Sequence, residues 1–329
     1  MQPLVFEVSF RPQIWGGRRL ERRLGKTLPS EGRFGESWEI SAHPDHLSRV
    51  AEGPLQGATL DMLAARHAPE LLGRARASPY GFPWLVKFLD CHEQLSVQVH
   101  PDDETAQRLL HQPIGKTEAW VVLDVGPAGR IHAGLKPGTT QADLMRHLDA
   151  GTVAECLHSF SPRPGDCVFF PAGTVHAAGD GVVLAEVQQT SDATFRLFDW
   201  NRLDADGKPR PLHRQEALES IHWPADPVMP VKPRMLPDVP AGACGERLVT
   251  CEYFCLDRFR LAGDLPVPRP GGMSVWILIE GSAELSADDG SYRRGFRAGE
   301  TVLIPACASA LTWSASGNID ATLLAVTEP

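Results

Sequence analysis

The sequence lacks the features of a membrane-spanning or secreted protein. None of its apolar runs approaches the roughly 18 residues that a transmembrane helix needs. Residues 1–7 hold no basic segment followed by a long apolar run, so they do not resemble a signal peptide. The seven cysteines are odd in number and scattered, with no CxxC pair, and we interpret them as free thiols in a reducing compartment. We therefore expect a cytoplasmic protein that does not bind membranes.

Positive charge is also scarce. With 32 Lys and Arg against 41 Asp and Glu, the formal net charge is -9, which argues against a general nucleic-acid-binding surface. A local cationic pocket for a small phosphorylated molecule remains compatible with this charge. The length of 329 residues and the hydrophobic content of 43% suffice for two domains or for one duplicated β architecture.

Few segments have a helical pattern. Instead, 30 glycines and 28 prolines separate short apolar runs, which is typical of a mostly β protein with many turns. Helices are expected around residues 60–66, 104–110 and 140–150, the last with Thr140 as N-cap and Gly151 after its end. The expected strands are 37–41, 84–89, 95–100, 119–125, 167–170, 182–188 and 194–200.

An internal repeat indicates that the chain has two related parts. Residues 165–172 (GDCVFFPA) recur as residues 299–306 (GETVLIPA). Each copy has a turn glycine, an acid, an apolar strand and a Pro-Ala corner. Two unrelated hairpins could share this pattern, so the repeat is informative only together with the chemistry around it. Between the copies, the proline-rich residues 224–240 show no periodicity and are predicted to connect two domains.

A candidate metal ligand follows the first copy. The spacing is Gly165, five residues, Pro171, one residue, Gly173, two residues, His176, three residues, Asp180. It resembles the second cupin motif, which differs in ending with Asn. Because Gly173 permits a tight corner and Pro171 ends the strand, His176 is expected to point back into a β-barrel.

The other ligands are expected upstream. On a strand, Ser96, Gln98 and His100 share one face, and Glu118 stands 18 residues after His100, where the next apolar strand begins. A single histidine is more often structural than metal-binding, but four residues arranged as one cupin site indicate a metal. The set Gln98, His100, Glu118 and His176 suits one Zn²⁺, with Mn²⁺, Fe²⁺ or Co²⁺ also acceptable.

Longer motifs extend this similarity to one family. The chain resembles the type I mannose-6-phosphate isomerases, and most of all their short bacterial form, in residues 14–17, 35–41, 85–90, 95–103, 115–120, 165–177 and 185–200. The resemblance covers residue 4 to about residue 221 and weakens to general cupin similarity beyond residue 240. It implies a mostly β, double cupin fold with a few helices inserted in the N-terminal half. The implied parts are a catalytic metal-binding domain over 1–223, the connector over 224–240 and a degenerate cupin over 241–329.

The resemblance also implies residue roles. In that family the equivalents of Gln98, His100, Glu118 and His176 bind zinc, and the equivalent of Arg196 is treated as catalytic. Glu186 corresponds to an acidic position in the same pocket. We expect Lys116 to act with these two residues in catalysis, and Trp15, Glu36 and Ser96 to bind substrate. Trp15 could instead pack in the N-terminal strand.

The implied activity interconverts mannose 6-phosphate and fructose 6-phosphate, a small phosphorylated sugar being the only partner expected. A proton moves between C2 and C1 through an enediol, which requires a Lewis acid, a base of suitable pKa and a cation for the phosphate, for which Arg is well suited. The base remains open between Glu186, Lys116 and a metal-bound water, with Glu186 slightly favoured. Glu186 could instead only orient Arg196.

Arg196 itself has two interpretations. Its strand and that of Glu186 are separated by the short turn at residues 190–192, which predicts a hairpin that brings the two side chains together in the barrel mouth. Alternatively, Arg196 lies on the surface and pairs with Asp192 or Asp199.

The second cupin is expected to bind no metal. Cys307 replaces the corner glycine, Ala310 stands at the ligand position, and residues 274–286 contain no histidine. This half would then serve to pack against the first cupin or to close its mouth.

Two other functions are compatible with a cupin: an Fe²⁺-dependent oxygenase and a non-enzymatic sugar-binding protein.

Overall fold

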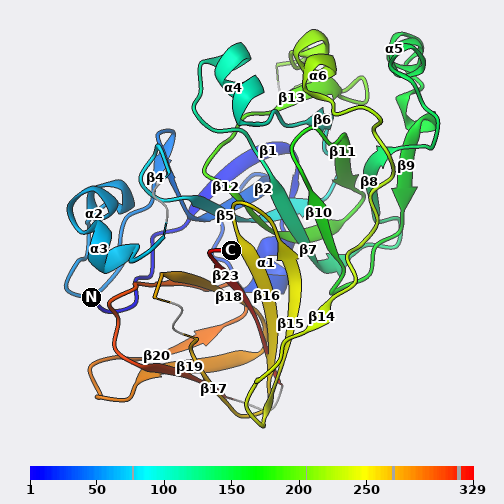
Figure 1. The fold of residues 1–329 in the computed structure, drawn as a ribbon. Coiled ribbons are helices and arrows are strands. Elements are labelled where there is room, and N and C mark those ends of the chain that lie inside the picture. Colours follow the sequence, from blue (N-terminus) through cyan, green and yellow to red (C-terminus); the bar gives the residue numbers. More distant parts are fainter. Residues whose placement is uncertain (76–77, 205, 269–270, 317–319) are drawn as a thin grey trace.

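The computed structural model of the chain describes residues 1–75, 78–204, 206–268, 271–316 and 320–329 (Figure 1). Its first half contains two antiparallel sheets that face each other as a barrel. The six-stranded sheet has the order β1 (Ser9–Gly17), β2 (Phe34–Ile40), β5 (Trp84–Cys91), β12 (Val182–Gln189), β7 (Glu118–Val125), β10 (Cys167–Phe170). The five-stranded sheet has the order β13 (Phe195–Phe198), β6 (Val97–Val99), β11 (His176–Gly179), β8 (Arg130–Leu135), β9 (Leu157–Phe160).

The second half repeats this arrangement with shorter connections, as the double cupin predicts. Its six-stranded sheet has the order β14 (Arg234–Met235), β15 (Ala243–Thr250), β16 (Cys255–Leu261), β23 (Ala321–Thr327), β18 (Ser274–Glu280), β21 (Thr301–Ile304). Its four-stranded sheet has the order β17 (Asp264–Pro266), β22 (Leu311–Ala315), β19 (Ser282–Ala287), β20 (Arg293–Arg297). A further pair, β3 (Ala42–His43) and β4 (His46–Leu47), stands apart from the barrels.

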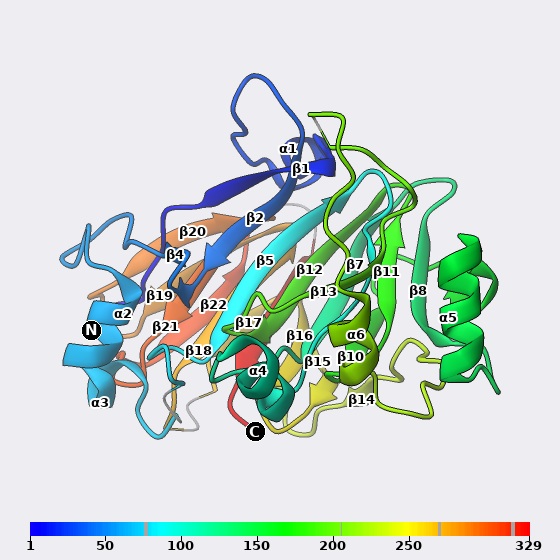
Figure 2. The same ribbon diagram turned by 90° about the horizontal axis from the view of Figure 1, so that it is seen from above.

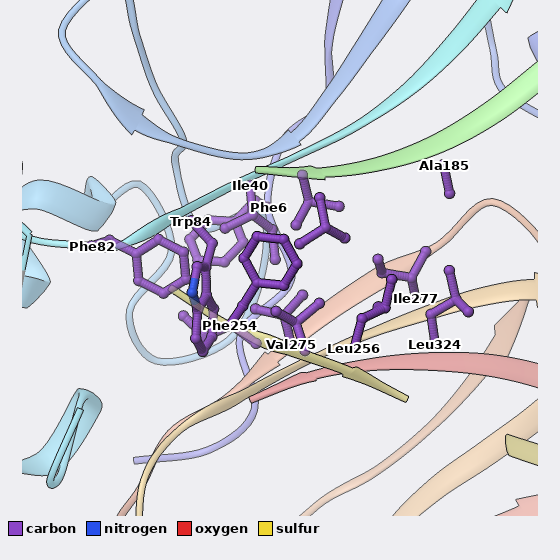
Figure 3. Close-up of a cluster of buried hydrophobic side chains, with 14 of the residues drawn as sticks. Phe6, Ile40, Phe82, Trp84, Ala185, Phe254, Leu256, Val275, Ile277 and Leu324 are labelled. Carbon is purple, nitrogen blue, oxygen red and sulfur yellow. The ribbon is translucent and has the colours of Figure 1, made fainter. Parts of the chain in front are cut away.

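The two six-stranded sheets pack against each other and form a core that both halves share (Figure 3). Trp84, Val86 and Phe88 of β5 belong to this core together with Val275 and Ile277 of β18. Successive residues of a strand face opposite sides, so one set of side chains enters the shared core and the other set faces the barrel. Each of these sheets is therefore buried on both faces. This explains why the central strands read as continuous apolar runs. The halves are therefore joined by a large apolar interface and not only by the connector.

Strand β12 shows how this packing directs polar side chains inward. Val183, Ala185 and Val187 lie in the shared core, so Glu186 and Gln188 must point the other way, into the first barrel. Both are nearly inaccessible to solvent. The alternation thus buries charged and amide groups in the barrel interior, where they need partners.

The internal repeat has the same local geometry in both halves. Gly165 and Gly299 both adopt a positive φ, of 90° and 92°. Gly165 N donates to Val122 O on β7, and Gly299 N donates to the corresponding Leu278 O on β18, each at 2.8 Å. The similarity of residues 165–172 and 299–306 is therefore structural.

All six α-helices of the described residues belong to the first half, as predicted. They are α1 (Arg19–Leu24), α2 (Leu60–Arg66), α3 (Ala68–Leu71), α4 (Asp103–Leu110), α5 (Gln141–Ala150) and α6 (Arg214–Ser220), with a 3₁₀ turn at Val153–Glu155. Thr140 caps α5 and Gly151 ends it in the left-handed conformation. Seen from above, α4 and α6 lie beside each other and α5 lies at one edge (Figure 2). No helix among the described residues has the length and apolarity required to cross a bilayer.

One prediction about the strands is wrong. The turn at residues 190–192 does not make a hairpin, because β12 is already paired on both edges, with β5 and β7. The chain crosses instead to the opposite sheet, where β13 pairs with β6. Glu186 and Arg196 thus lie on different sheets of the barrel.

The core of the second half contains a cluster of aromatic side chains. The Phe259 and Trp276 rings stack at 5.5 Å between centroids, and Trp313 lies against both Trp276 and Phe296. All four side chains are at most 4% exposed. This packing supports the prediction that this half has a structural role. The exact limits of the two domains, at residues 223 and 241, stay a prediction.

Candidate metal centre and active site

Three of the four predicted ligands converge in the first barrel. His100, Glu118 and His176 offer ligand atoms that all lie within 4.8 Å of one another, and all three side chains are buried. Glu118 Oε1 is 3.1 Å from His176 Nε2, and Glu118 Oε2 is 3.5 Å from His100 Nε2. The predicted fourth ligand, Gln98, is the register partner of His176 and its amide nitrogen is 3.3 Å from His176 Nε2. If the Gln98 amide is turned by 180°, its oxygen takes the place of its nitrogen beside His176 Nε2.

The histidines are held in the orientation that a metal site requires. His100 Nδ1 is 2.8 Å from the Ala193 carbonyl, and His176 Nδ1 is 2.8 Å from the Thr174 carbonyl. Because a carbonyl can only accept, each Nδ1 must be the protonated nitrogen, and each Nε2 keeps its lone pair for a metal. Burial, together with Lys116, lowers the pKa of His100 to about 3, so this ring is neutral.

The polar atoms at the centre fit a cation. His100 Nε2 and Glu118 Oε1 are buried without a hydrogen-bond partner among the described residues, whereas Glu118 Oε2 is paired with the Lys116 ammonium 2.9 Å away. Leaving such atoms unpaired is costly, and a divalent ion would satisfy both His100 Nε2 and Glu118 Oε1. A set of two imidazoles, one carboxylate and one amide oxygen suits Zn²⁺ and related ions. The residues present therefore fit a metal, whose identity they leave open.

A network of buried charges surrounds these ligands. Lys116 Nζ lies 2.9 Å from Glu118 Oε2 and 3.6 Å from Glu186 Oε1. Burial alone would lower the pKa of Lys116, but the two carboxylates outweigh burial and raise it. The pKa of Glu186 is raised by its burial, which outweighs the opposing effect of Lys116 and Lys87. Glu186 Oε2 also accepts a hydrogen bond from Trp120 Nε1 at 2.9 Å.

Lys87 is a central residue of this network that the motif analysis did not single out. Its ammonium lies 3.1 Å from Asp192, 3.4 Å from Glu36 and 3.8 Å from Glu186. It also lies over the Trp38 ring, 4.4 Å from the centroid. The sequence did contain a signal for this residue, a single lysine inside the apolar strand Trp84–Cys91. A charge in a strand that is buried on both faces must have a partner.

Replacing Lys87 with methionine is expected to destabilise the protein by about 3 kcal/mol, because it leaves buried carboxylates without their cation. Urea denaturation at neutral pH measures this change. The matched control is Lys232→Met, at an exposed position, which should change stability by less than about 0.5 kcal/mol. Equal stability of the two variants would show that the Lys87 contacts contribute nothing.

Arg196 lies on the same face of its sheet as two ligands. It is the register partner of Gln98, which is in turn the register partner of His176, and directly opposed residues in a sheet point to the same side. Arg196 Nη1 donates to the Pro211 carbonyl at 2.8 Å, while its Nε has no partner among the described residues. Arg196 thus lies on the strand next to that of Gln98 and two strands from that of His176.

The alternative surface pairing of Arg196 is not formed. Asp199 is bound by Arg202 and Arg210, each at 2.6 Å, and Asp192 is bound by Lys87. Within the described part of the chain, no carboxylate lies within ion-pair distance of Arg196. Burial and the neighbouring Arg210 lower the pKa of its guanidinium.

The three predicted substrate-binding residues differ in their surroundings. Trp15 is 4% exposed and belongs to the core of the first barrel, which supports packing as its main role. Glu36 accepts hydrogen bonds from Gln13 Nε2 and Trp38 Nε1 and pairs with Lys87, which joins it to the charge network. Ser96 is buried directly before β6, on the face of Gln98. Contact of these residues with substrate stays a prediction.

Comparison with known proteins identifies the family. Residues 4–116 match the family description "Phosphomannose isomerase type I, catalytic domain". The mannose-6-phosphate isomerase ManA of Bacillus subtilis is 35% identical over 305 residues, which cover 92% of this chain and 93% of the relative.

The chain belongs to the type I phosphomannose isomerases. The mannose-6-phosphate isomerase of Streptococcus mutans is also similar, with 32% identity over 97% of this chain and 96% of its own. The crystal structure of mannose 6-phosphate isomerase from Bacillus subtilis superimposes with a TM-score of 0.88 at 31% identity, over 99% of this chain and 100% of that chain. The similarity to these relatives therefore extends over both halves of the molecule, including the second cupin.

Proposed function

We propose that this phosphomannose isomerase interconverts mannose 6-phosphate and fructose 6-phosphate by moving a proton between C2 and C1. The observation that supports this most directly is the pairing of a His-Glu-His cluster with buried acid and base groups beside it. A divalent metal bound by Gln98, His100, Glu118 and His176 would act as a Lewis acid that stabilises negative charge on the sugar oxygens. Zn²⁺ is the ion that we propose, one for each chain.

Glu186 is the best candidate for the base that transfers the proton. Its Oε1 has no hydrogen-bond partner among the described residues, and its Oε2 is fixed by Trp120. Lys116 lies between Glu118 and Glu186, and two carboxylates favour its charged form, which cannot accept a proton. Lys116 is therefore better suited to stabilise developing negative charge. The hypothesis that Glu186 orients Arg196 is not favoured, because among the described residues the ion pairs of Glu186 are with Lys87 and Lys116.

Arg196 is proposed to bind the substrate phosphate or the enediolate oxygen. Its position beside the ligand row and its partnerless Nε leave guanidinium donors available. A planar guanidinium binds phosphate oxygens in a bidentate way.

The Glu186→Gln variant is expected to lower kcat by about 10²- to 10³-fold, the range for loss of a general base. Glutamine can keep the Trp120 hydrogen bond but cannot take up a proton. Metal content should be unchanged, because Glu186 is not a ligand. Metal analysis and steady-state kinetics on the same preparation check this. A variant with parental kcat would assign the base to another group.

The proposed function is tested by assaying purified protein with mannose 6-phosphate and following fructose 6-phosphate, with metal content measured in parallel. An isomerase gives product without consuming oxygen. Oxygen uptake would favour a cupin oxygenase, and sugar binding without turnover a non-enzymatic cupin. Neither alternative explains why Lys116 and Glu186 are buried beside the ligands.

The cytoplasm is the proposed compartment. All seven cysteines are free in the structure, and Cys91, Cys156, Cys167 and Cys255 are buried. Free thiols are maintained in a reducing environment.

A further inference from the structure

The loop that precedes β7 is held by three hydrogen bonds from outside its own strand. Gly115 N donates to Asp103 Oδ1 at 2.7 Å, Lys116 N donates to the Pro101 carbonyl at 2.9 Å, and Thr117 N donates to Gln189 Oε1 at 2.8 Å. The backbone packs so closely that a Cβ on Gly115 would lie 2.4 Å from the Pro101 carbonyl oxygen. Since Gly115–Thr117 forms no regular structure, these bonds determine where Lys116 points.

Asp103 connects two of these bonds. Its Oδ1 also accepts a hydrogen bond from Gln189 Nε2 at 3.0 Å. The Gln189 side chain therefore bridges Asp103 and Thr117, and it is 3% exposed. Bonds to an ionised carboxylate are stronger than neutral ones. Asp103 thus anchors the loop directly at Gly115 and indirectly at Thr117.

The same carboxylate contacts the second cupin. Tyr253, in the turn between β15 and β16, donates from its hydroxyl to Asp103 Oδ2 at 3.4 Å. The Tyr253 carbonyl accepts a hydrogen bond from Trp84 Nε1 at 2.9 Å, which ties this turn to the shared core. Asp103 and Tyr253 both line a cavity of about 710 Å³ at the junction of the halves.

We propose that Asp103 is a positioning residue for the isomerase reaction, and that the second cupin supports the active-site loop through Tyr253. Asp103 touches neither the ligands nor Glu186 and acts through the loop that places Lys116 and Glu118. The second cupin, whose described residues hold no cluster of metal ligands, would in this way contribute to turnover as well as to stability. The inference rests on the proposed function.

The test compares metal-loaded Asp103→Ala and Asp103→Asn with the parent. The alanine variant loses both anchors and is expected to lower kcat per bound metal about tenfold, the scale of a small misplacement of catalytic groups. The asparagine oxygen can still accept from Gly115 and Gln189, so this variant should keep kcat within about threefold of the parent. Tyr253→Phe removes only the hydroxyl and should lower kcat by about two- to threefold.

The matched control is Asp102→Ala. Asp102 caps the same helix by accepting a bond from Thr105 N, so its loss weakens α4 while the Asp103 bonds remain. Thermal stability should fall in both alanine variants, but kcat per bound metal should fall only in Asp103→Ala. Equal kcat in the two variants, or an asparagine variant as impaired as alanine, overturns the proposal.

Hydrogen exchange gives a readout that does not depend on activity. The Gly115 and Thr117 amides should exchange at least about tenfold faster in Asp103→Ala than in the parent. Unchanged exchange overturns the positioning role even if kcat falls. If the parent itself does not isomerise the sugar phosphate, the proposed function fails, and the exchange experiment still decides the role of Asp103 in the loop. Should Asp103→Ala not fold, Tyr253→Phe with parental kcat and exchange overturns the role of the second cupin.

Discussion

A His176→Ala variant is expected to contain almost no metal and to lose at least about a thousandfold in kcat, equivalent to about 4 kcal/mol of transition-state stabilisation. His176 offers a buried Nε2 whose ring is fixed through the Thr174 carbonyl, and alanine has no ligand atom. The parent should contain about one metal per chain, because the described residues hold one cluster of candidate ligands, His100, Glu118 and His176. Metal analysis of both proteins, followed by the isomerase assay, measures these effects.

The control for His176→Ala is His92→Ala, at an exposed histidine that should leave metal and activity unchanged. His176 also packs against Phe170 and Trp120, so His176→Leu, which fills more of the space but offers no ligand atom, separates lost packing from lost ligation. Full metal content and activity in His176→Ala would exclude the proposed site. Two metals per parent chain would contradict the metal-free second cupin.

The second large effect is expected at Arg196. Arg196→Ala should lower kcat/KM by about 10²- to 10³-fold, the loss seen when one preorganised donor to a developing negative charge is removed. Arg196→Lys keeps the charge but loses the planar fork, so it should still cost roughly tenfold or more. Metal content should remain that of the parent, since Arg196 lies one strand away from Gln98. Kinetics with mannose 6-phosphate and metal analysis check both variants.

Arg130→Ala is the matched control for Arg196. Arg130 begins β8 in the same sheet, but its side chain is exposed, and its loss should not affect turnover. Near-parental kcat and KM in Arg196→Ala would make Arg196 a structural residue that only binds the Pro211 carbonyl. A loss of metal along with activity would instead point to a collapse of the ligand row.

The sequence predicted which residues gather at the candidate metal centre because their positions depend on local geometry. Gln98 and His100 share a face through the two-residue period of a strand, and Gly173 adopts the positive φ of 83° that the turn before His176 requires. Helix limits were equally local. A helix was predicted around residues 60–66 and is found at Leu60–Arg66, and Thr140 caps its helix through a reciprocal bond with Asp143.

The tertiary structure alone decided which strands become neighbours. A strand pattern shows which residues share a face but does not show the partner strand, so the crossing of β13 to the opposite sheet was not foreseen. The same holds for the ion pairs of the buried Lys87 with Asp192 and Glu36, and for the contact of Tyr253 with Asp103 across 150 residues. These contacts form because a buried charge must find a partner wherever the packed sheets bring one within reach. The sequence by itself thus determined the fold class and the residues of the His-Glu-His cluster, whereas the packing of the two cupins decided how the charges around that cluster are arranged.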